Sequence, residues 1–174
     1  MQFVPWRYIA DWKCISCGMC CRFYSVVLSF PEWLNIVHRY GVEHTASGLD
    51  KLFIRRRSDG SCAFLSDFSN ASACELQSRK PRACKIWPFK VQVKPEFGYA
   101  HQAAYPVGQN RLFIYADPAC HGLTYGHPTW EFANFTLKEF VQIAMGIRET
   151  QCKTTGAVPS YANLGIIRSL RKHI

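Results

Sequence analysis

The sequence lacks any long apolar run. Hydrophobic residues make up 48% of its 174 positions, but they occur in short stretches that charged residues or proline interrupt. A membrane-spanning helix needs about 20 consecutive apolar residues, so we expect no membrane span. The first 13 residues also lack the apolar core and the small-residue cleavage site of a signal peptide. We therefore predict that the protein is cytoplasmic.

Acidic residues are also few. The chain has 12 Asp and Glu against 21 Lys and Arg, which gives a formal net charge of +9. Such a balance attracts polyanions such as nucleic acid, and it also aids solubility. Bound metal would offset part of it, because four thiolates on Zn(II) or on an oxidised four-iron cluster leave a centre of about −2. A Gly-rich nucleotide motif, a methyl-donor site and an RNA-binding signature are all missing, so the sequence does not decide whether the protein is an enzyme.

The hydrophobic pattern predicts a small α+β domain with short antiparallel strands, a few helices and a cysteine-rich loop core. We expect this domain to span residues 1–152 and a basic amphipathic helical extension to span residues 153–174. Predicted helices cover 31–40 after the N-cap Ser29, 137–149 after a capping box of Thr136 and Glu139, and 161–172. Predicted strands cover 23–28, 51–57, 89–93 and 112–115, and residues 68–74 read as a polar loop.

Cysteine, in contrast, is abundant. The nine cysteines are Cys14, Cys17, Cys20, Cys21, Cys62, Cys74, Cys84, Cys120 and Cys152. In a reducing compartment, dense cysteines are more often metal ligands than disulfides. The odd number also leaves one cysteine over from any fully paired scheme. We therefore interpret most of them as metal ligands.

The stretch "CISCGMCC" at residues 14–21 chains two C-x-x-C spacings. Two residues between cysteines let both thiolates face one metal, and Gly18 suits the positive φ that such turns often need. Cys21 follows Cys20 directly, and successive side chains tend to diverge. Cys21 therefore belongs to a second site or is a buried thiol. Cys152 stands apart, and we expect it to pack as a small hydrophobic residue.

The downstream cysteines are single and widely spaced. Together with the first four they make eight, which is enough for two four-cysteine centres or for one centre plus spare thiols. Zinc ribbons usually pair two C-x-x-C knuckles, whereas a dense cluster followed by single cysteines favours a cage around an iron–sulfur cluster. Zinc stays an alternative, because four thiolates suit both. His121 directly follows Cys120, and it could replace a thiolate or be a hydrogen-bonded loop histidine.

The order of these motifs resembles a known family. "CISCGMCC", "CAFL", "CELQSRKPRACKIWPF" and "CHG" are similar, in series, to the YkgJ-like cysteine-cluster proteins, described as zinc- or iron-chelating domains with a C-x-x-C-x-x-C-C signature. Lys80 and Lys85 stand where the family usually has arginine, and residues 123–174 lie outside the resemblance. The resemblance implies metal binding more strongly than any reaction. The ligands that it implies are Cys14, Cys17, Cys20, Cys21, Cys62, Cys74, Cys84 and Cys120.

Two basic runs are candidates for nucleic-acid contact. They consist of Arg55, Arg56 and Arg57 and of Arg168, Arg171 and Lys172. Affinity for nucleic acid comes largely from such charges, but a solvated face is the simpler interpretation of each run.

Two hypotheses follow. The first is a metalloprotein with a 4Fe–4S cluster, or two metal sites, that transfers electrons or serves as an accessory subunit of a larger complex. The second is a zinc-stabilised basic module that binds RNA or a ribonucleoprotein such as the ribosome.

Overall fold

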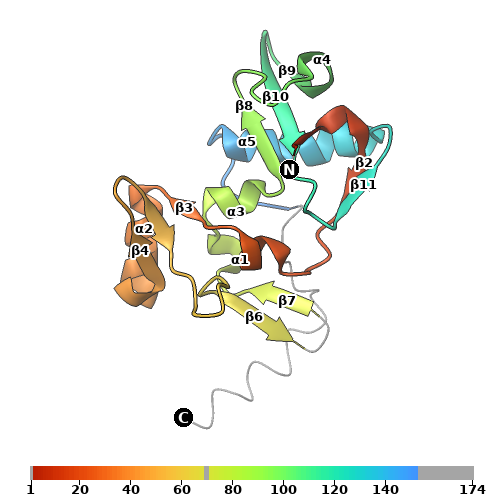
Figure 1. Ribbon diagram of the computed structural model, residues 1–174. Helices are drawn as coiled ribbons and strands as arrows, with labels where there is room; N and C mark the ends of the chain where they lie inside the picture. The colour runs from red at the N-terminus through yellow and green to blue at the C-terminus, as the bar shows by residue number, and fades with distance from the viewer. Residues whose placement is uncertain (1, 69–70, 153–174) are drawn as a thin grey trace.

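The computed structural model describes residues 2–68 and 71–152 and shows the predicted α+β architecture (Figure 1). The α-helices of this part of the chain are α1 (Met19–Phe23), α2 (Phe30–Tyr40), α3 (Arg82–Ile86), α4 (Ala100–Ala103) and α5 (Leu137–Ala144). Short 3₁₀ helices occupy Trp6–Tyr8, Val42–His44 and Gln77–Arg79, and a π-helical turn spans Phe132–Thr136.

The strands form small antiparallel sheets. A four-stranded sheet has the order β1 (Val4–Pro5), β10 (Asn110–Ala116), β8 (Phe89–Gln92), and β9 (Ala104–Val107) also pairs with β10. A three-stranded sheet has the order β3 (Val27–Leu28), β5 (Leu52–Ile54), β4 (Thr45–Ser47). The remaining pairs are β2 (Ile9–Trp12) with β11 (Leu123–Tyr125), and β6 (Leu65–Phe68) with β7 (Ala71–Cys74).

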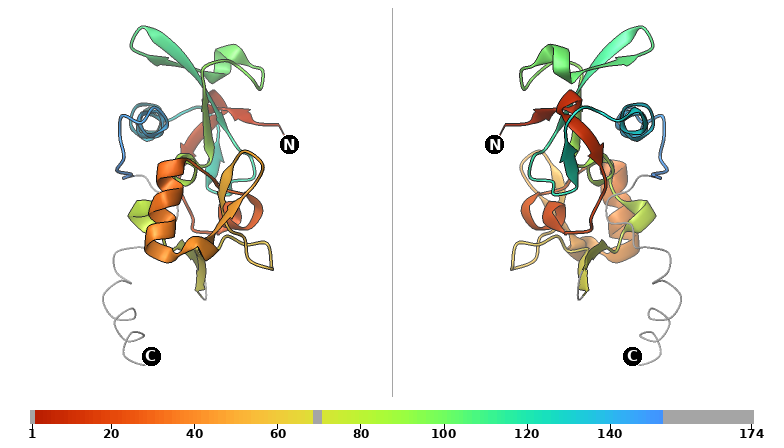
Figure 2. Two further views of the ribbon diagram at one scale, coloured as in Figure 1. Left: turned by 90° about the vertical axis from the view of Figure 1, so that its left-hand side faces the viewer. Right: turned by 90° about the vertical axis from the view of Figure 1, so that its right-hand side faces the viewer.

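Two hydrophobic clusters form the core. The first cluster lies between the four-stranded sheet and α5 and consists of Trp6, Ile9, Trp12, Phe89, Ile114, Ala116, Phe132, Leu137, Phe140 and Val141. The second cluster lies between α2 and the three-stranded sheet and consists of Leu28, Ile36, Ile54, Cys62, Phe64, Leu65 and Leu76. Burying these side chains is the main favourable contribution to folding. In Figures 1 and 2 the chain around α1 lies between the four-stranded sheet and the β6–β7 hairpin.

The helix predicted after Ser29 is confirmed. Ser29 and Glu32 form a capping box, in which the Ser29 amide and hydroxyl each donate to Glu32 Oε2 over 2.8 Å. The helix ends at Gly41, which has a φ of 96° and donates its N–H to the Val37 carbonyl. Both signals are local, so the sequence was enough to define this helix.

The predicted capping box at Thr136 is wrong. Thr136 has helical φ and ψ angles and is buried inside a continuous helical stretch that includes the π-helical turn before it. Phe132 and Phe140 both pack against Phe89, so the apolar face continues on the N-terminal side of Thr136. The helix therefore begins earlier than predicted, and α5 ends at Ala144 rather than at residue 149.

The predicted strands have mixed outcomes. Those at 89–93 and 112–115 are confirmed as β8 and β10, and the one at 51–57 is shorter, as β5. Residues 23–28 form a strand only at Val27–Leu28, because Phe23 ends α1. Residues 71–74 are β7 rather than polar loop. The predicted helix at 161–172 and extension at 153–174 lie outside the described residues.

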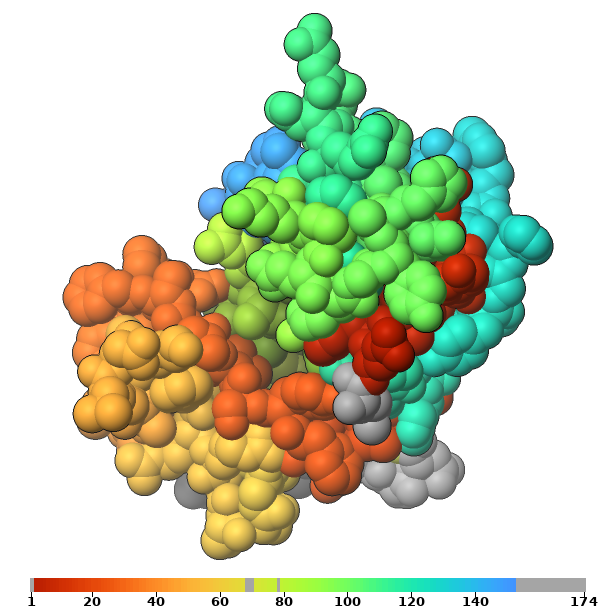
Figure 3. Space-filling model, turned by 45° about the horizontal axis from the view of Figure 1, so that its top comes forward, coloured from red at the N-terminus to blue at the C-terminus, as the bar shows by residue number. Residues whose placement is uncertain are grey.

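Along the described ranges 2–68 and 71–152, no helix has the length and apolar character that crossing a membrane requires. Figure 3 shows that the surface is hollowed between the orange part of the chain, which includes α2, and the green part that belongs to the four-stranded sheet.

Candidate metal centre

All eight cysteines that the family resemblance implied as ligands line one cavity of about 340 Å³. They come from the loop before α1, from α1, from the segment before β6, from β7, from α3 and from the loop before β11. The ninth cysteine, Cys152, and the candidate ligand His121 are not among the lining residues. The fold thus gathers side chains that are up to 106 positions apart (Cys14 to Cys120) around one space.

The loop before α1 is held in place by its contacts with β7. Gly18 has a φ of 70°, and a Cβ at this position would lie 2.6 Å from the Ser72 hydroxyl oxygen. The Ser72 amide donates to the Ser16 carbonyl over 2.8 Å. Arg22 forms two 2.7 Å hydrogen bonds with Asp67, which also accepts from the Ser72 hydroxyl. The predicted positive φ at Gly18 is confirmed, and it brings the first cysteines over β7.

The pairing of β2 with β11 brings Cys14 to the loop that carries Cys120. The Lys13 amide donates to the Gly122 carbonyl over 3.0 Å, and a Cβ at Gly122 would overlap the Lys13 carbonyl oxygen. Only glycine allows this close approach of two backbones. The Trp12 indole N–H also donates to Cys120 Sγ over 3.4 Å. Both cysteines pack against the first cluster.

Three of the other cysteines that line the cavity lie in the second hydrophobic cluster or pack against it. Cys62 is only 6% exposed and belongs to this cluster, and Cys21 and Cys74 pack against it. The Cys62 amide donates to the Cys21 carbonyl over 2.8 Å, and Cys74 pairs with Leu65 in the β6–β7 hairpin. The thiol cavity therefore lies where the two hydrophobic clusters meet.

The effect of one cysteine's negative charge on the pKa of another identifies a first group of neighbouring thiols. Burial raises the pKa of the Cys120 thiol, the indole hydrogen bond of Trp12 lowers it, and the nearby Cys14 and Cys17 raise it. A charge affects the pKa of another group in this way only at short range. Cys14, Cys17 and Cys120 therefore form one group.

A second group follows from the same reasoning. Burial raises the pKa of Cys62 to about 11, and Cys21 and Cys74 add to this rise. Burial also raises the pKa of Cys84 well above its usual value, with contributions from the same three cysteines. Cys20 lies at the border, with its Sγ 3.9 Å from that of Cys21. Their hydrogen bond is the largest cause of the raised pKa of Cys21.

Two further residues at the cavity were not singled out as functional by the sequence. Trp12 reaches Cys120 through its indole N–H, and its position two residues before Cys14 was the only signal. Lys80 is 4% exposed and lines the cavity. Burial raises the pKa of Cys74 and Cys84, and the positive charge of Lys80 opposes that rise. Both residues stabilise negative charge on sulfur.

The eight thiols line a cavity, but they do not converge on a single position of the size of one ion. Within residues 2–68 and 71–152, no three or more His, Cys, Asp or Glu side chains are arranged to hold a metal ion as they stand. The chemistry of the donors nevertheless fits, because thiolates are the preferred ligands of zinc and of iron–sulfur clusters.

Fold and cavity together define a small α+β domain built around a set of cysteine thiols. The chain belongs to the CxxCxxCC family, whose model carries the description "Putative zinc- or iron-chelating domain" and matches residues 13–121. The family resemblance is therefore confirmed, and metal binding is the function that this family indicates. No curated protein and no solved structure matches the chain.

The basic run at residues 55–57 makes contacts inside the protein. Each of its guanidinium groups donates to a backbone carbonyl, from Arg55 to Thr45, from Arg56 to Tyr24 and from Arg57 to Ala63. These bonds hold the turn between β5 and Cys62. Arg168, Arg171 and Lys172 lie outside the described residues, so nucleic-acid binding by either run stays a prediction.

Proposed function

We propose that the protein is an iron–sulfur protein with two centres, each held by four cysteine thiolates. The observation that carries the proposal is the single cavity of about 340 Å³ that all eight cysteines line. One centre takes Cys14, Cys17, Cys20 and Cys120, and the other takes Cys21, Cys62, Cys74 and Cys84. The mutual effects of the thiols on their pKa values support grouping Cys14 and Cys17 with Cys120, and Cys21, Cys74 and Cys84 with Cys62.

The assignment of Cys20 and Cys21 to different centres rests on their adjacency. The two thiols lie 3.9 Å apart, but adjacent residues of a helix present their side chains about 100° apart around its axis, and Cys21 contacts the second cluster. The raised pKa of Cys62 and Cys84 has Cys21 among its causes. Cys20 then completes the group of Cys14, Cys17 and Cys120 as its fourth thiol.

The volume of the cavity favours clusters over zinc. A structural zinc site draws four thiolates to about 2.3 Å from one ion and leaves no space between them. An iron–sulfur cluster contains its own iron and sulfide atoms, so its thiolates stand further apart around a larger volume. A cavity of about 340 Å³ has room for such a group.

The chain's own residues fit a role in electron transfer. When bound, an iron–sulfur cluster supplies one-electron redox chemistry. Hydrogen bonds to cysteine sulfur and nearby positive charge set the potential of such a centre, and here Trp12 and Lys80 supply them. Two centres in one cavity would let electrons pass between them. We infer that the protein acts as an electron carrier or as an accessory subunit of a larger complex.

Iron, sulfide and zinc assays on anaerobically purified protein test the proposal. We expect visible absorbance and comparable amounts of iron and sulfide. Cys17→Ala and Cys62→Ala should each remove about half of the iron, since they affect different centres, and the control Cys152→Ala should leave it unchanged. A colourless protein loaded with zinc would refute the clusters. Loss of all iron in both variants, or equal loss in the control, would refute the division of ligands.

A further inference from the structure

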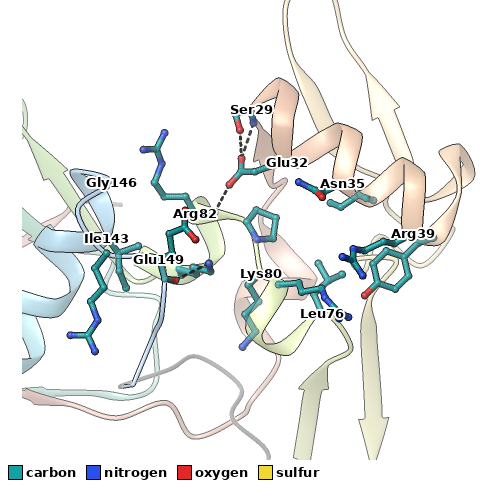
Figure 4. Close-up of a pocket in the computed structure, with 16 residues that line it drawn as sticks. Ser29, Glu32, Asn35, Arg39, Leu76, Lys80, Arg82, Ile143, Gly146 and Glu149 are labelled. Atoms are coloured by element: carbon teal, nitrogen blue, oxygen red, sulfur yellow. Dashed lines mark hydrogen bonds between the residues drawn. The ribbon is translucent and has the colours of Figure 1, made fainter.

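A second cavity, of about 510 Å³, lies between α2, the segment from Leu76 to Lys85 and the chain that follows α5 (Figure 4). Its lining is strongly basic. The cationic residues that line it are Arg39, Arg79, Lys80, Arg82, Lys85 and Arg148, and the carboxylates are Glu32 and Glu149. This one cavity therefore holds a large share of the chain's positive excess.

The carboxylate of Glu32 is already engaged by the backbone. Its Oε2 accepts from the amide and the hydroxyl of Ser29, and its Oε1 accepts from the Arg82 amide over 2.6 Å. Burial acts to raise the pKa of Glu32, but these hydrogen bonds, with a smaller contribution from the Arg82 charge, lower it overall, so the group is ionised. Figure 4 shows this carboxylate turned toward Ser29 and the backbone of Arg82. The Glu32 carboxylate therefore stabilises the first turn of α2 and the contact between α2 and the start of α3.

Three of the arginines are available to a ligand. Arg39, Arg79 and Arg82 are exposed, and within the described part of the chain their side chains form no salt bridge with a carboxylate. Arg148, in contrast, lies 3.7 Å from Glu139, and Lys85 donates to the Glu149 carbonyl over 3.0 Å. The exposed arginines come from two segments about 40 residues apart, and they converge on one hollow.

Anions with several oxygen atoms suit such a site. Guanidinium groups bind phosphate through paired, charge-assisted hydrogen bonds, and Lys80 adds a buried positive charge at the inner wall. The volume falls within the range of about 300–1,000 Å³ that is usual for small-molecule pockets. The half-buried Tyr40 provides most of the apolar surface beside the charges, and the nearly buried Ile36 and Ile143 add little to it.

We propose that this cavity binds a small organic phosphate with more than one phosphate group. The excess of positive charge over two carboxylates calls for a multiply charged anion, and the apolar residues would contact its organic part. The site is separate from the thiol cavity but shares a wall with it. Arg82 and Lys85 of α3 line the basic cavity, Ala83, Cys84 and Ile86 line the thiol cavity, and Lys80 lines both.

Calorimetric titration of the full-length, metal-loaded protein with inorganic pyrophosphate tests this site. The variant Arg39→Gln/Arg79→Gln/Arg82→Gln removes the three exposed arginines. We expect it to bind pyrophosphate at least about tenfold more weakly than the unmodified protein, because several charge-assisted hydrogen bonds are lost. Binding to the unmodified protein should also weaken as salt is raised.

A matched control separates the cavity from the general charge of the chain. Lys94→Gln/Arg111→Gln/Lys138→Gln removes the same charge from exposed positions that do not line the cavity, and its affinity should be unchanged. The single variant Arg39→Gln should lose affinity severalfold, and circular dichroism and metal content verify the fold of each variant. Equal weakening in the control, or no binding of pyrophosphate to the unmodified protein at millimolar concentration, would overturn the proposal.

Discussion

Glu32 connects α2 to α3, and its removal gives a sharp test of the local architecture. The variant Glu32→Ala loses the capping box, which contributes about 1 kcal/mol in typical helices. It also leaves the Arg82 amide without its 2.6 Å acceptor, and a hydrogen bond of this kind contributes about another 1 kcal/mol. We therefore expect the free energy of unfolding at pH 7 to fall by about 2 kcal/mol. Urea denaturation measures this difference.

The pH dependence gives the same prediction a second readout. Burial acts to raise the pKa of Glu32, but hydrogen bonds from Arg82 and Ser29 lower it overall, so the folded state favours the ionised form. The stabilisation of the folded state by ionised Glu32 is therefore fully present above the unfolded pKa of about 4.3. It is lost as the pH falls through the lower pKa of the folded state. The difference between the two proteins should shrink below about pH 4.

The exposed Glu96 supplies the control for charge alone. Glu96→Ala removes the same charge from a position outside both cavities, and it should change the free energy of unfolding by less than about 0.5 kcal/mol. If Glu32→Ala were no more destabilising than Glu96→Ala, or if its effect were the same at pH 3 and pH 7, our account of this carboxylate would be wrong.

Two further substitutions test how the backbone and the indole shape the thiol cavity. Trp12→Phe removes the N–H donated to Cys120 Sγ but keeps an aromatic ring in the core. We therefore expect the protein to lose metal to a chelator faster and to be destabilised by about 1 kcal/mol. An unchanged rate of metal loss would contradict this expectation. Gly122→Ala places a Cβ on the Lys13 carbonyl. It should lower the metal content, and it should lower the free energy of unfolding by more than about 2 kcal/mol. Gly48→Ala serves as the milder comparison in the same assays, because its Cβ would approach no atom closer than a Phe53 ring carbon at 3.2 Å.

The sequence was most informative where the signals were local. The cap at Ser29 and the stop at Gly41 defined α2 because both act within a single turn. The first four cysteines stand out because their C-x-x-C spacing is written in the sequence, whereas the four downstream cysteines were implied as ligands by the family resemblance. The fold class followed from short runs of alternating apolar residues.

Predictions failed where distant contacts decide the structure. Thr136 carries a capping signal, yet Phe132 packs on Phe89 and extends the helix past it. Residues 71–74 look polar, yet Ser72 binds the backbone at Ser16 and the strand β7 closes the thiol cavity. Neither contact can be seen in a window of neighbouring residues.

The basic cavity could not be anticipated for the same reason. Its arginines belong to α2, to the 3₁₀ turn before α3, to α3 itself and to the chain after α5. In the sequence Arg79 and Arg82 lie within a short basic stretch, but Arg39 and Arg148 are far from it. The more conspicuous run at residues 55–57 binds its own backbone. A run of charges in the sequence therefore does not by itself predict a charged pocket. Only charges that lie close together in the folded protein indicate one.

The position of the thiols between the two hydrophobic clusters links metal binding to folding. Cys14 and Cys120 pack on the first cluster, whereas Cys62 belongs to the second. Without metal, the cavity between them is lined by thiols whose burial disfavours ionisation. In the proposed centres, thiolate ligation would replace those protons and tie the clusters together, so the free energy of metal binding would become part of the free energy of folding. The junction between the clusters should therefore be the first region to open when the metal is removed.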